Sequence, residues 1–135
     1  MKFIKVLVLS LILTSLYGCN KDVTDQILGK WVGSETYHSE DGRGLEVNAS
    51  LSISKYGNGV KIIINEERIV SGMSLASRNG TFTNKESINA YVVENNISLN
   101  SDGSSPLFIF DEKENTLTQQ ARPLASRNNL VFRKE

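Results

Sequence analysis

The residues of this sequence best suited to chemistry are its single cysteine, Cys19, and its single histidine, His38. A Ser-His-Asp triad would have to use His38, and no serine stands in the Gly-x-Ser-x-Gly setting of a nucleophile elbow. Glu40 and Asp41 follow His38 closely, but no second histidine or free cysteine accompanies them as a metal ligand. A histidine beside acids in a polar stretch is typical of a solvated loop. The sequence therefore predicts a protein that is not an enzyme and holds no metal or cofactor.

Cys19 ends an N-terminal segment that has the layout of a secretory signal. Residues 1–5 carry two lysines, and residues 6–16 form an apolar run too short for a membrane-spanning helix. The segment closes with Leu16-Tyr17-Gly18-Cys19, which resembles the lipobox of bacterial lipoproteins, although the tyrosine is bulkier than the family's usual residue. The resemblance implies cleavage between Gly18 and Cys19 and acylation of the cysteine, which anchors the mature protein to a membrane. The alternatives are a secreted protein with a stray thiol and a true N-terminal membrane helix.

The residues after Cys19, and the net charge of the mature chain, are consistent with a protein of the bacterial envelope. Asn20 is not the aspartate that retains many such lipoproteins in the inner membrane, so the resemblance implies the outer membrane, on its periplasmic face or at the cell surface. Removing residues 1–18 from the 135-residue chain leaves 117 residues, enough for one domain with one core. That mature chain has 13 basic and 15 acidic residues and a net charge near −2, so nothing in it attracts nucleic acid.

Alternating apolar and polar residues predict β-strands along most of the mature chain. The alternation is clearest over Leu45–Lys55, and after the turn Tyr56-Gly57-Asn58-Gly59 the apolar Val60–Ile64 returns to complete a hairpin. A charged turn joins Leu107–Phe110 to Thr116–Ala121 in a second predicted hairpin. Other predicted strands are Lys30–Tyr37, Arg68–Leu75, Gly80–Thr83, Ile88–Val93, Ile97–Leu99 and Asn129–Arg133.

Helix signals are confined to one turn at Thr24–Gly29, with Thr24 as N-cap and Gly29 as stop. Short strands at close spacing without helices between them favour an all-β fold. We expect a small antiparallel up-and-down barrel of about eight strands, with a β-sandwich as the alternative. The predicted organisation is a signal peptide at residues 1–18, a tether at 19–27 and a β-barrel domain at 28–135.

Gly29-Lys30-Trp31 opens the first predicted strand directly after the helical turn. This resembles the Gly-x-Trp entrance of lipocalins and of small lipocalin-like bacterial lipoproteins. In that family the tryptophan closes the bottom of the barrel and an arginine from the last strand packs over it. The resemblance gives these parts to Trp31 and Arg133, a pairing that cation–π attraction would favour. An eight-stranded barrel is either filled by its own side chains or holds one small ligand.

A five-residue repeat is the remaining unusual feature. Leu75-Ala76-Ser77-Arg78-Asn79 recurs as Leu124-Ala125-Ser126-Arg127-Asn128, and each copy precedes a predicted strand. One interpretation is a similar loop that enters a strand in both places. The other is that Arg78 and Arg127 flank one end of the barrel and bind an anion or a partner's carboxylate, because arginine offers a forked donor.

Two functions are consistent with these features. The first is a lipid-anchored, lipocalin-like barrel that binds a small apolar molecule or a lipid. The second is a protein-interaction role, as a periplasmic inhibitor, an immunity protein or an accessory subunit, with Arg78, Arg127 and Glu40-Asp41 as the first surfaces to test. An internal apolar pocket would favour the first function, and a filled barrel would count against it. The expected partners are the membrane, through the lipid on Cys19, and either that ligand or an envelope protein.

Overall fold

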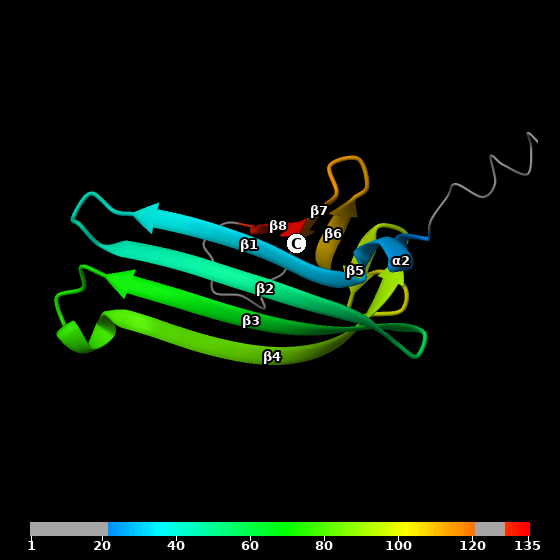
Figure 1. The fold of residues 1–135 in the computed structure, drawn as a ribbon, viewed down its shortest axis with the longest axis horizontal. Helices are drawn as coiled ribbons and strands as arrows, with labels where there is room; N and C mark the ends of the chain where they lie inside the picture. The colour runs from blue at the N-terminus through cyan, green and yellow to red at the C-terminus, as the bar shows by residue number, and fades with distance from the viewer. Residues whose placement is uncertain (1–21, 121–128) are drawn as a thin grey trace, which may run out of the picture.

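The computed structural model describes residues 22–120 and 129–135, which form a closed antiparallel barrel of eight strands (Figure 1). Strands that are consecutive in the chain are neighbours in the barrel, and β8 closes it against β1. The predicted all-β up-and-down barrel is confirmed, and the β-sandwich is excluded. The signal peptide, the lipobox with Gly18 and Cys19, and Arg127 lie outside the described residues.

The elements follow one another in the chain as a single meander. They are α2 (Val23–Ile27), β1 (Gly29–His38), β2 (Gly44–Tyr56), β3 (Gly59–Ser71), the 3-10 turn η1 (Ala76–Arg78), β4 (Gly80–Val93), β5 (Asn96–Ser98), β6 (Pro106–Asp111), β7 (Thr116–Gln119) and β8 (Val131–Lys134). Within the described ranges, no helix has the length and apolar character needed to cross a bilayer.

Two strands are longer than the sequence pattern predicts. β3 runs unbroken through the polar residues that separate the predicted Val60–Ile64 and Arg68–Leu75, and β4 likewise joins Gly80–Thr83 to Ile88–Val93. Backbone pairing continues through both polar stretches, with Glu66 opposite Ala49 on β2 and opposite Asn84 on β4. The alternation of residue types fails where a polar residue such as Glu66 occupies the buried inner face, although the backbone remains paired there.

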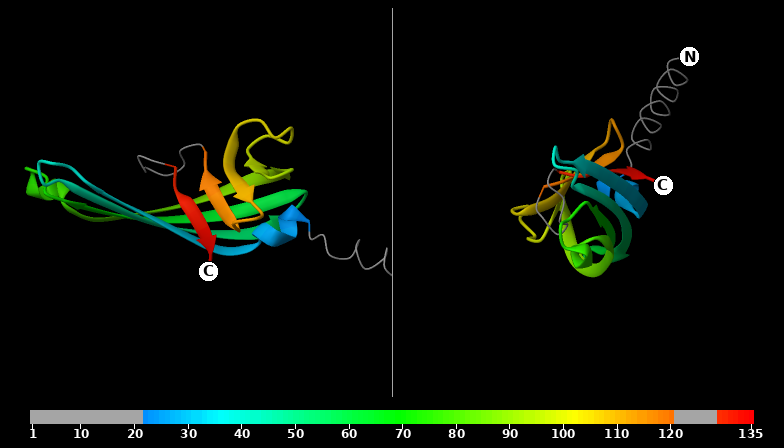
Figure 2. Two further views of the ribbon diagram at one scale, coloured as in Figure 1. Left: turned by 90° about the horizontal axis from the view of Figure 1, so that it is seen from above. Right: turned by 90° about the vertical axis from the view of Figure 1, so that its left-hand side faces the viewer.

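The eight strands differ greatly in length, and this gives the molecule its shape. β1–β4 have 10, 13, 13 and 14 residues, whereas β5–β8 have 3, 6, 4 and 4. β8 pairs with β1 only at Trp31 and Val32, and β5 pairs with β4 only over Tyr91–Val93. The four long strands therefore continue past the short ones as a curved sheet, which we call the sheet extension (Figure 2).

The closed end of the barrel is packed with aromatic side chains. Trp31, Phe108 and Phe132 are fully buried and Phe110 is nearly so. Trp31 meets Phe110 edge-to-face at 6.2 Å between ring centroids, and Phe108 meets Phe132 in the same way at 5.8 Å. Such pairs contribute beyond the apolar area that they bury. The interior at this end is occupied by the protein's own side chains.

The short helix α2 is part of this packed end. Asp22 is its N-cap, in place of the predicted Thr24, since the Asp22 carboxylate accepts a hydrogen bond from the Thr24 amide. Ile27 is fully buried, and its carbonyl accepts a 2.8 Å hydrogen bond from the Trp31 indole. The predicted tether of residues 19–27 is therefore too long, because the packed domain already includes residues 23–27.

The cation over the tryptophan is Lys134, and the assignment of this role to Arg133 was wrong. Lys134 is paired with Trp31 across the β1–β8 ladder, whereas Arg133 is paired with the outward-facing Val32. The Lys134 ammonium lies 5.6 Å from the indole centroid and donates a 2.8 Å hydrogen bond to the carbonyl of Gln26. Successive strand residues face opposite sides, so a shift of one position moves the cation across the sheet.

Replacing Lys134 by methionine is expected to lower the free energy of unfolding by about 1 kcal/mol, through loss of the cation–π contact and of the bond to the α2 carbonyl. Arg133→Met is the matched control, since Arg133 faces solvent and its loss is expected to change stability by less than about 0.5 kcal/mol. Urea unfolding of the two variants measures the difference. If the two variants lost the same stability, the contact with Trp31 could not be assigned to Lys134 in preference to Arg133.

Candidate functional site

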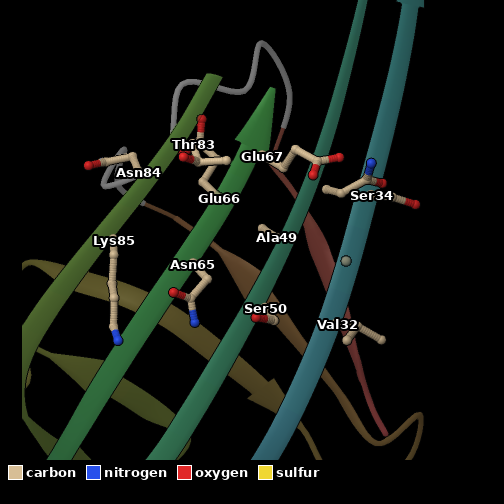
Figure 3. Close-up of a pocket in the computed structure, with 12 residues that line it drawn as sticks. Val32, Ser34, Ala49, Ser50, Asn65, Glu66, Glu67, Thr83, Asn84 and Lys85 are labelled. Carbon is tan, nitrogen blue, oxygen red and sulfur yellow. The ribbon is translucent and has the colours of Figure 1, made fainter. Parts of the chain in front are cut away.

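A hollow of about 900 Å³ lies across the middle of β1–β4 (Figure 3). Each of the four strands contributes three consecutive residues to it. They are Val32, Gly33 and Ser34 from β1; Asn48, Ala49 and Ser50 from β2; Asn65, Glu66 and Glu67 from β3; and Thr83, Asn84 and Lys85 from β4. We call this hollow the polar trough.

The polar trough opens on the outer face of the sheet, because the inner face is filled at the same level. A Cβ added at Gly33 would lie 2.9 Å from the Val131 carbonyl oxygen and 3.0 Å from the Phe132 ring. Ala49 and Glu66, which share the inner face with Gly33, are only 6% and 5% exposed. The backbone of Gly33, Ala49 and Glu66 thus forms the floor of the trough, and the side chains of Ala49 and Glu66 are buried on the inner face.

Two rows of outward side chains border that floor. Strand register pairs Val32 with Ser50, Ser50 with Asn65 and Asn65 with Lys85, which makes the row nearer the closed end. It pairs Ser34 with Asn48, Asn48 with Glu67 and Glu67 with Thr83, which makes the second row.

Each row contains hydroxyl and amide side chains, and these groups donate and accept hydrogen bonds. Lys85 and Glu67 add one charge of each sign. The trough can therefore form hydrogen bonds with a polar surface.

An ion pair between a buried carboxylate and a partly exposed arginine lies beneath the trough, on the inner face. The Glu66 side chain is 4% exposed and its carboxylate lies 3.2 Å from Nε of Arg68, whose side chain is 42% exposed. Burial of a carboxylate is costly unless a cation or hydrogen-bond donors compensate it. Arg68 thus stabilises the part of β3 that carries Asn65 and Glu67.

Replacing Arg68 alone is expected to lower stability more than replacing both members of the ion pair. We expect Arg68→Met to lower the free energy of unfolding by about 2 kcal/mol, because it leaves the buried Glu66 carboxylate without its cation. This value is below that of a fully buried pair, since Arg68 is partly exposed. The double variant Glu66→Gln with Arg68→Met should recover part of that loss. Thermal or urea unfolding of the two single variants and the double variant gives a double-mutant cycle. If the stability losses of the single variants simply added up in the double variant, the ion pair would contribute nothing to stability.

The loops singled out in the sequence lie at the tip of the sheet extension. The β1–β2 turn carries Glu40 and Asp41, and the β3–β4 connection carries the exposed Arg78. The two connections touch, since a Cβ added at Gly72 would collide with the backbone carbonyl of Gly42. The first copy of the repeat and the acidic stretch are therefore brought to one end.

Within that first copy, the residue with a clear structural contact is Asn79. Its side chain accepts a 2.8 Å hydrogen bond from the Met73 amide and donates one to the Met73 carbonyl. These bonds close the loop before β4 and support the interpretation of the repeat as a strand-entering loop. Arg78 lies on the one-turn η1. The anion-binding interpretation needs Arg127 as well, which lies outside the described residues.

Asp41 forms its contacts inside its own turn. Hydrogen bonds from the Ser39 hydroxyl and then from Arg43 lower the pKa of Asp41 from its ordinary 3.8 to about 2. The Arg43 guanidinium lies 2.8 Å from the Asp41 carboxylate, so the negative charge is locally compensated. In the described part of the chain, no three His, Cys, Asp or Glu side chains are grouped as a metal site.

A proton titration checks the arrangement of this turn. Because the pKa of Asp41 is lower in the folded state, its contribution to stability is present above the ordinary pKa and is lost as the pH falls through about 2. We expect the Asp41 carboxyl signal in NMR spectra to titrate near pH 2, and the Ser39→Ala variant to titrate at a higher pH. A midpoint unchanged by that substitution would contradict the assigned cause.

The sequence did not predict the polar trough. Strand alternation predicts Ser50 as an outward residue, but Asn65 lies between two predicted strands. The assembly of the rows also depends on the register between strands, which no single segment encodes. No family model, curated protein or solved structure matches this chain.

Proposed function

We propose that this protein is a lipid-anchored, non-catalytic protein of the bacterial envelope that binds another envelope protein through the polar trough. The observation that carries the proposal is the trough itself, a hollow of about 900 Å³ that spans four strands and is bordered by hydroxyl, amide and charged side chains. Interfaces of non-obligate complexes are about as polar as the rest of the surface and are held by many direct hydrogen bonds. An inhibitor, an immunity protein or an accessory subunit would use such a surface.

The packed interior favours this role over that of a carrier for an apolar ligand. A ligand inside the closed end would have to displace fully buried side chains, among them Trp31, Phe108 and Phe132. Deleting or displacing side chains of this size from a core typically costs several kcal/mol. Lipocalin-like binding of a small apolar or lipid molecule is therefore the competing outcome of the experiment below.

The anchor belongs to the same proposal. It rests on the lipobox-like Leu16-Tyr17-Gly18-Cys19 and on Asn20, which together favour acylation at Cys19 and the outer membrane. Two or three acyl chains hold a protein on a membrane stably, whereas a single chain does so only marginally. An anchored protein meets partners that share its compartment at a high local concentration.

Site-specific photo-crosslinking in cells tests the proposed partner surface. A photoreactive residue at Ser50 or Asn65 is expected to give one discrete protein adduct, since both side chains line the trough. The matched controls are Ile109 and Val131, which are 37% and 44% exposed on the short strands outside it.

A charged residue placed in the trough provides a second test of the proposed partner surface. Thr83→Arg should remove the adduct formed from Ser50 while leaving the melting temperature unchanged, because Thr83 is exposed at the border of the trough. Equal adducts from trough and control positions would overturn the proposal. So would a lipid or small apolar molecule that purifies with the barrel in stoichiometric amount when no adduct forms.

A further inference from the structure

The end of the barrel that carries α2 exposes three large side chains. Tyr56, Tyr91 and Leu99 are 57%, 41% and 49% exposed. They come from the end of β2, the end of β4 and the segment after β5, and with the turn glycines they line a second hollow of about 410 Å³. We call this surface the tyrosine end, and it lies opposite the tip of the sheet extension (Figures 1 and 2).

The helix α2 lies beside the tyrosine end. Asp25 of α2 lies 3.2 Å from the ammonium of Lys55, the residue directly before Tyr56. The buried Ile27 and its bond to Trp31 fix the other end of the helix to the core. The first described residue, Asp22, is thus held beside this surface, and the chain enters the barrel there.

The length of chain before Asp22 limits how far this surface can stand from an anchor at Cys19. Three residues lead from Cys19 to Asp22, and a chain spans at most about 3.6 Å per residue, which allows about 11 Å. The polar headgroup layer of a bilayer is roughly 5–8 Å thick on each side. An acylated Cys19 would therefore keep the tyrosine end within or beside the headgroups.

We propose that the tyrosine end is a membrane-contacting surface that rests in the headgroup layer of the anchoring bilayer. This inference depends on the acylation that forms part of the proposed function. Tyrosine suits that layer, because its ring is apolar and its hydroxyl is polar, and tyrosine is enriched where membranes meet water. Leu99 adds apolar area that the lipid would cover.

This contact sets the orientation of the whole molecule. The long strands lead from the tyrosine end to the far tip (Figure 1), so the sheet extension would project away from the bilayer. The polar trough lies part of the way along these strands, where a partner could approach it without competing with the membrane.

The experiment uses the full, acylated protein reconstituted in vesicles of phosphatidylethanolamine and phosphatidylglycerol. A spin label is attached at Asn58→Cys, in the turn of the tyrosine end, and in a separate sample at Ser74→Cys, in the connection between β3 and β4. The acylated Cys19 does not react with the label. Collision rates with oxygen and with a water-soluble nickel chelate report the depth of each label.

We expect the label at residue 58 to lose accessibility to nickel and gain accessibility to oxygen on vesicles, while the label at residue 74 keeps its values in solution. Replacing Tyr56, Tyr91 and Leu99 together by serine should shift the label at residue 58 toward its solution values. The control is Leu75→Ser with Phe82→Ser. It removes two apolar side chains that are 55% and 42% exposed outside the tyrosine end, and it should leave the accessibility of the label at residue 58 unchanged.

The outcomes separate this inference from the function on which it depends. If mass spectrometry finds no lipid on Cys19 and the protein does not float with vesicles, the anchor itself fails. If the protein is acylated and floats but the label at residue 58 keeps its solution values, only the membrane-contacting surface is overturned. If the triple variant lost a protein crosslink while the depth of the label at residue 58 stayed unchanged, the tyrosine end would be a protein interface and not a membrane-contacting surface. Should the triple variant melt at a lower temperature, Tyr56→Ser with Leu99→Ser serves in its place.

Discussion

Trp31→Ala is expected to lower the free energy of unfolding by about 3–5 kcal/mol, a large part of the stability of a domain of this size. Trp31 is fully buried, packs edge-to-face on Phe110, and donates its indole hydrogen to the Ile27 carbonyl. Alanine would leave a cavity where β1, α2 and β8 meet. It would also remove the ring beneath Lys134 and the donor that holds the end of the helix. Urea denaturation followed by circular dichroism measures the loss.

Two further variants separate these contributions. Trp31→Phe keeps an aromatic ring but loses the indole donor, so we expect an intermediate loss. Phe82→Ala is the control for removing an aromatic side chain of the sheet, because Phe82 is 42% exposed and is not one of the buried core residues. If Trp31→Ala cost no more than Phe82→Ala, the indole would not organise the closed end as described.

Cys19→Ser is expected to abolish the membrane attachment that we propose for this protein. Serine has no thiol to accept the diacylglycerol, and each buried methylene of an acyl chain contributes about 0.8 kcal/mol to membrane binding. The same change removes the cysteine before which cleavage is predicted, so the product should keep Met1. Fractionation of cells and intact mass measurement of the wild-type and variant proteins decide the matter.

The control for this prediction is a second substitution close to the anchor. Asn20→Ser leaves the lipobox unchanged and should be acylated and pelleted with membranes like the wild type. A wild-type protein that carries an unmodified thiol would contradict the lipobox interpretation. In that case the localisation, the proposed anchor and the membrane-contacting surface would all be lost, while the fold would stand.

The hairpins and the fold class were predictable because each depends on short-range patterns. Alternation over Leu45–Lys55 with the turn at residues 56–59 predicts β2 and β3, and both are found in register. The order of strands follows from short connections, which favour pairing of neighbours. Where polar residues occupy the inner face, as at Glu66, the pattern failed although the strand continued.

The functional surfaces were not predictable in the same way. The role given to Arg133 falls to Lys134, because the β1–β8 register places Lys134 opposite Trp31. The rows of the polar trough combine residues from four strands whose relative positions no local pattern specifies. The tyrosine end likewise combines Tyr56, Tyr91 and Leu99 from three separate segments.

By itself, the sequence of this protein determined most of the strand segments and their order as a meander, and it predicts which residue an acyl chain would modify. These properties depend on neighbours in the chain, through side-chain alternation, turn residues and a contiguous signal. Tertiary structure alone decided that the interior is filled, that the long strands project past the short ones, and which side chains line the outer face. Those properties depend on strand length and register, and these are set by contacts between residues far apart in the chain.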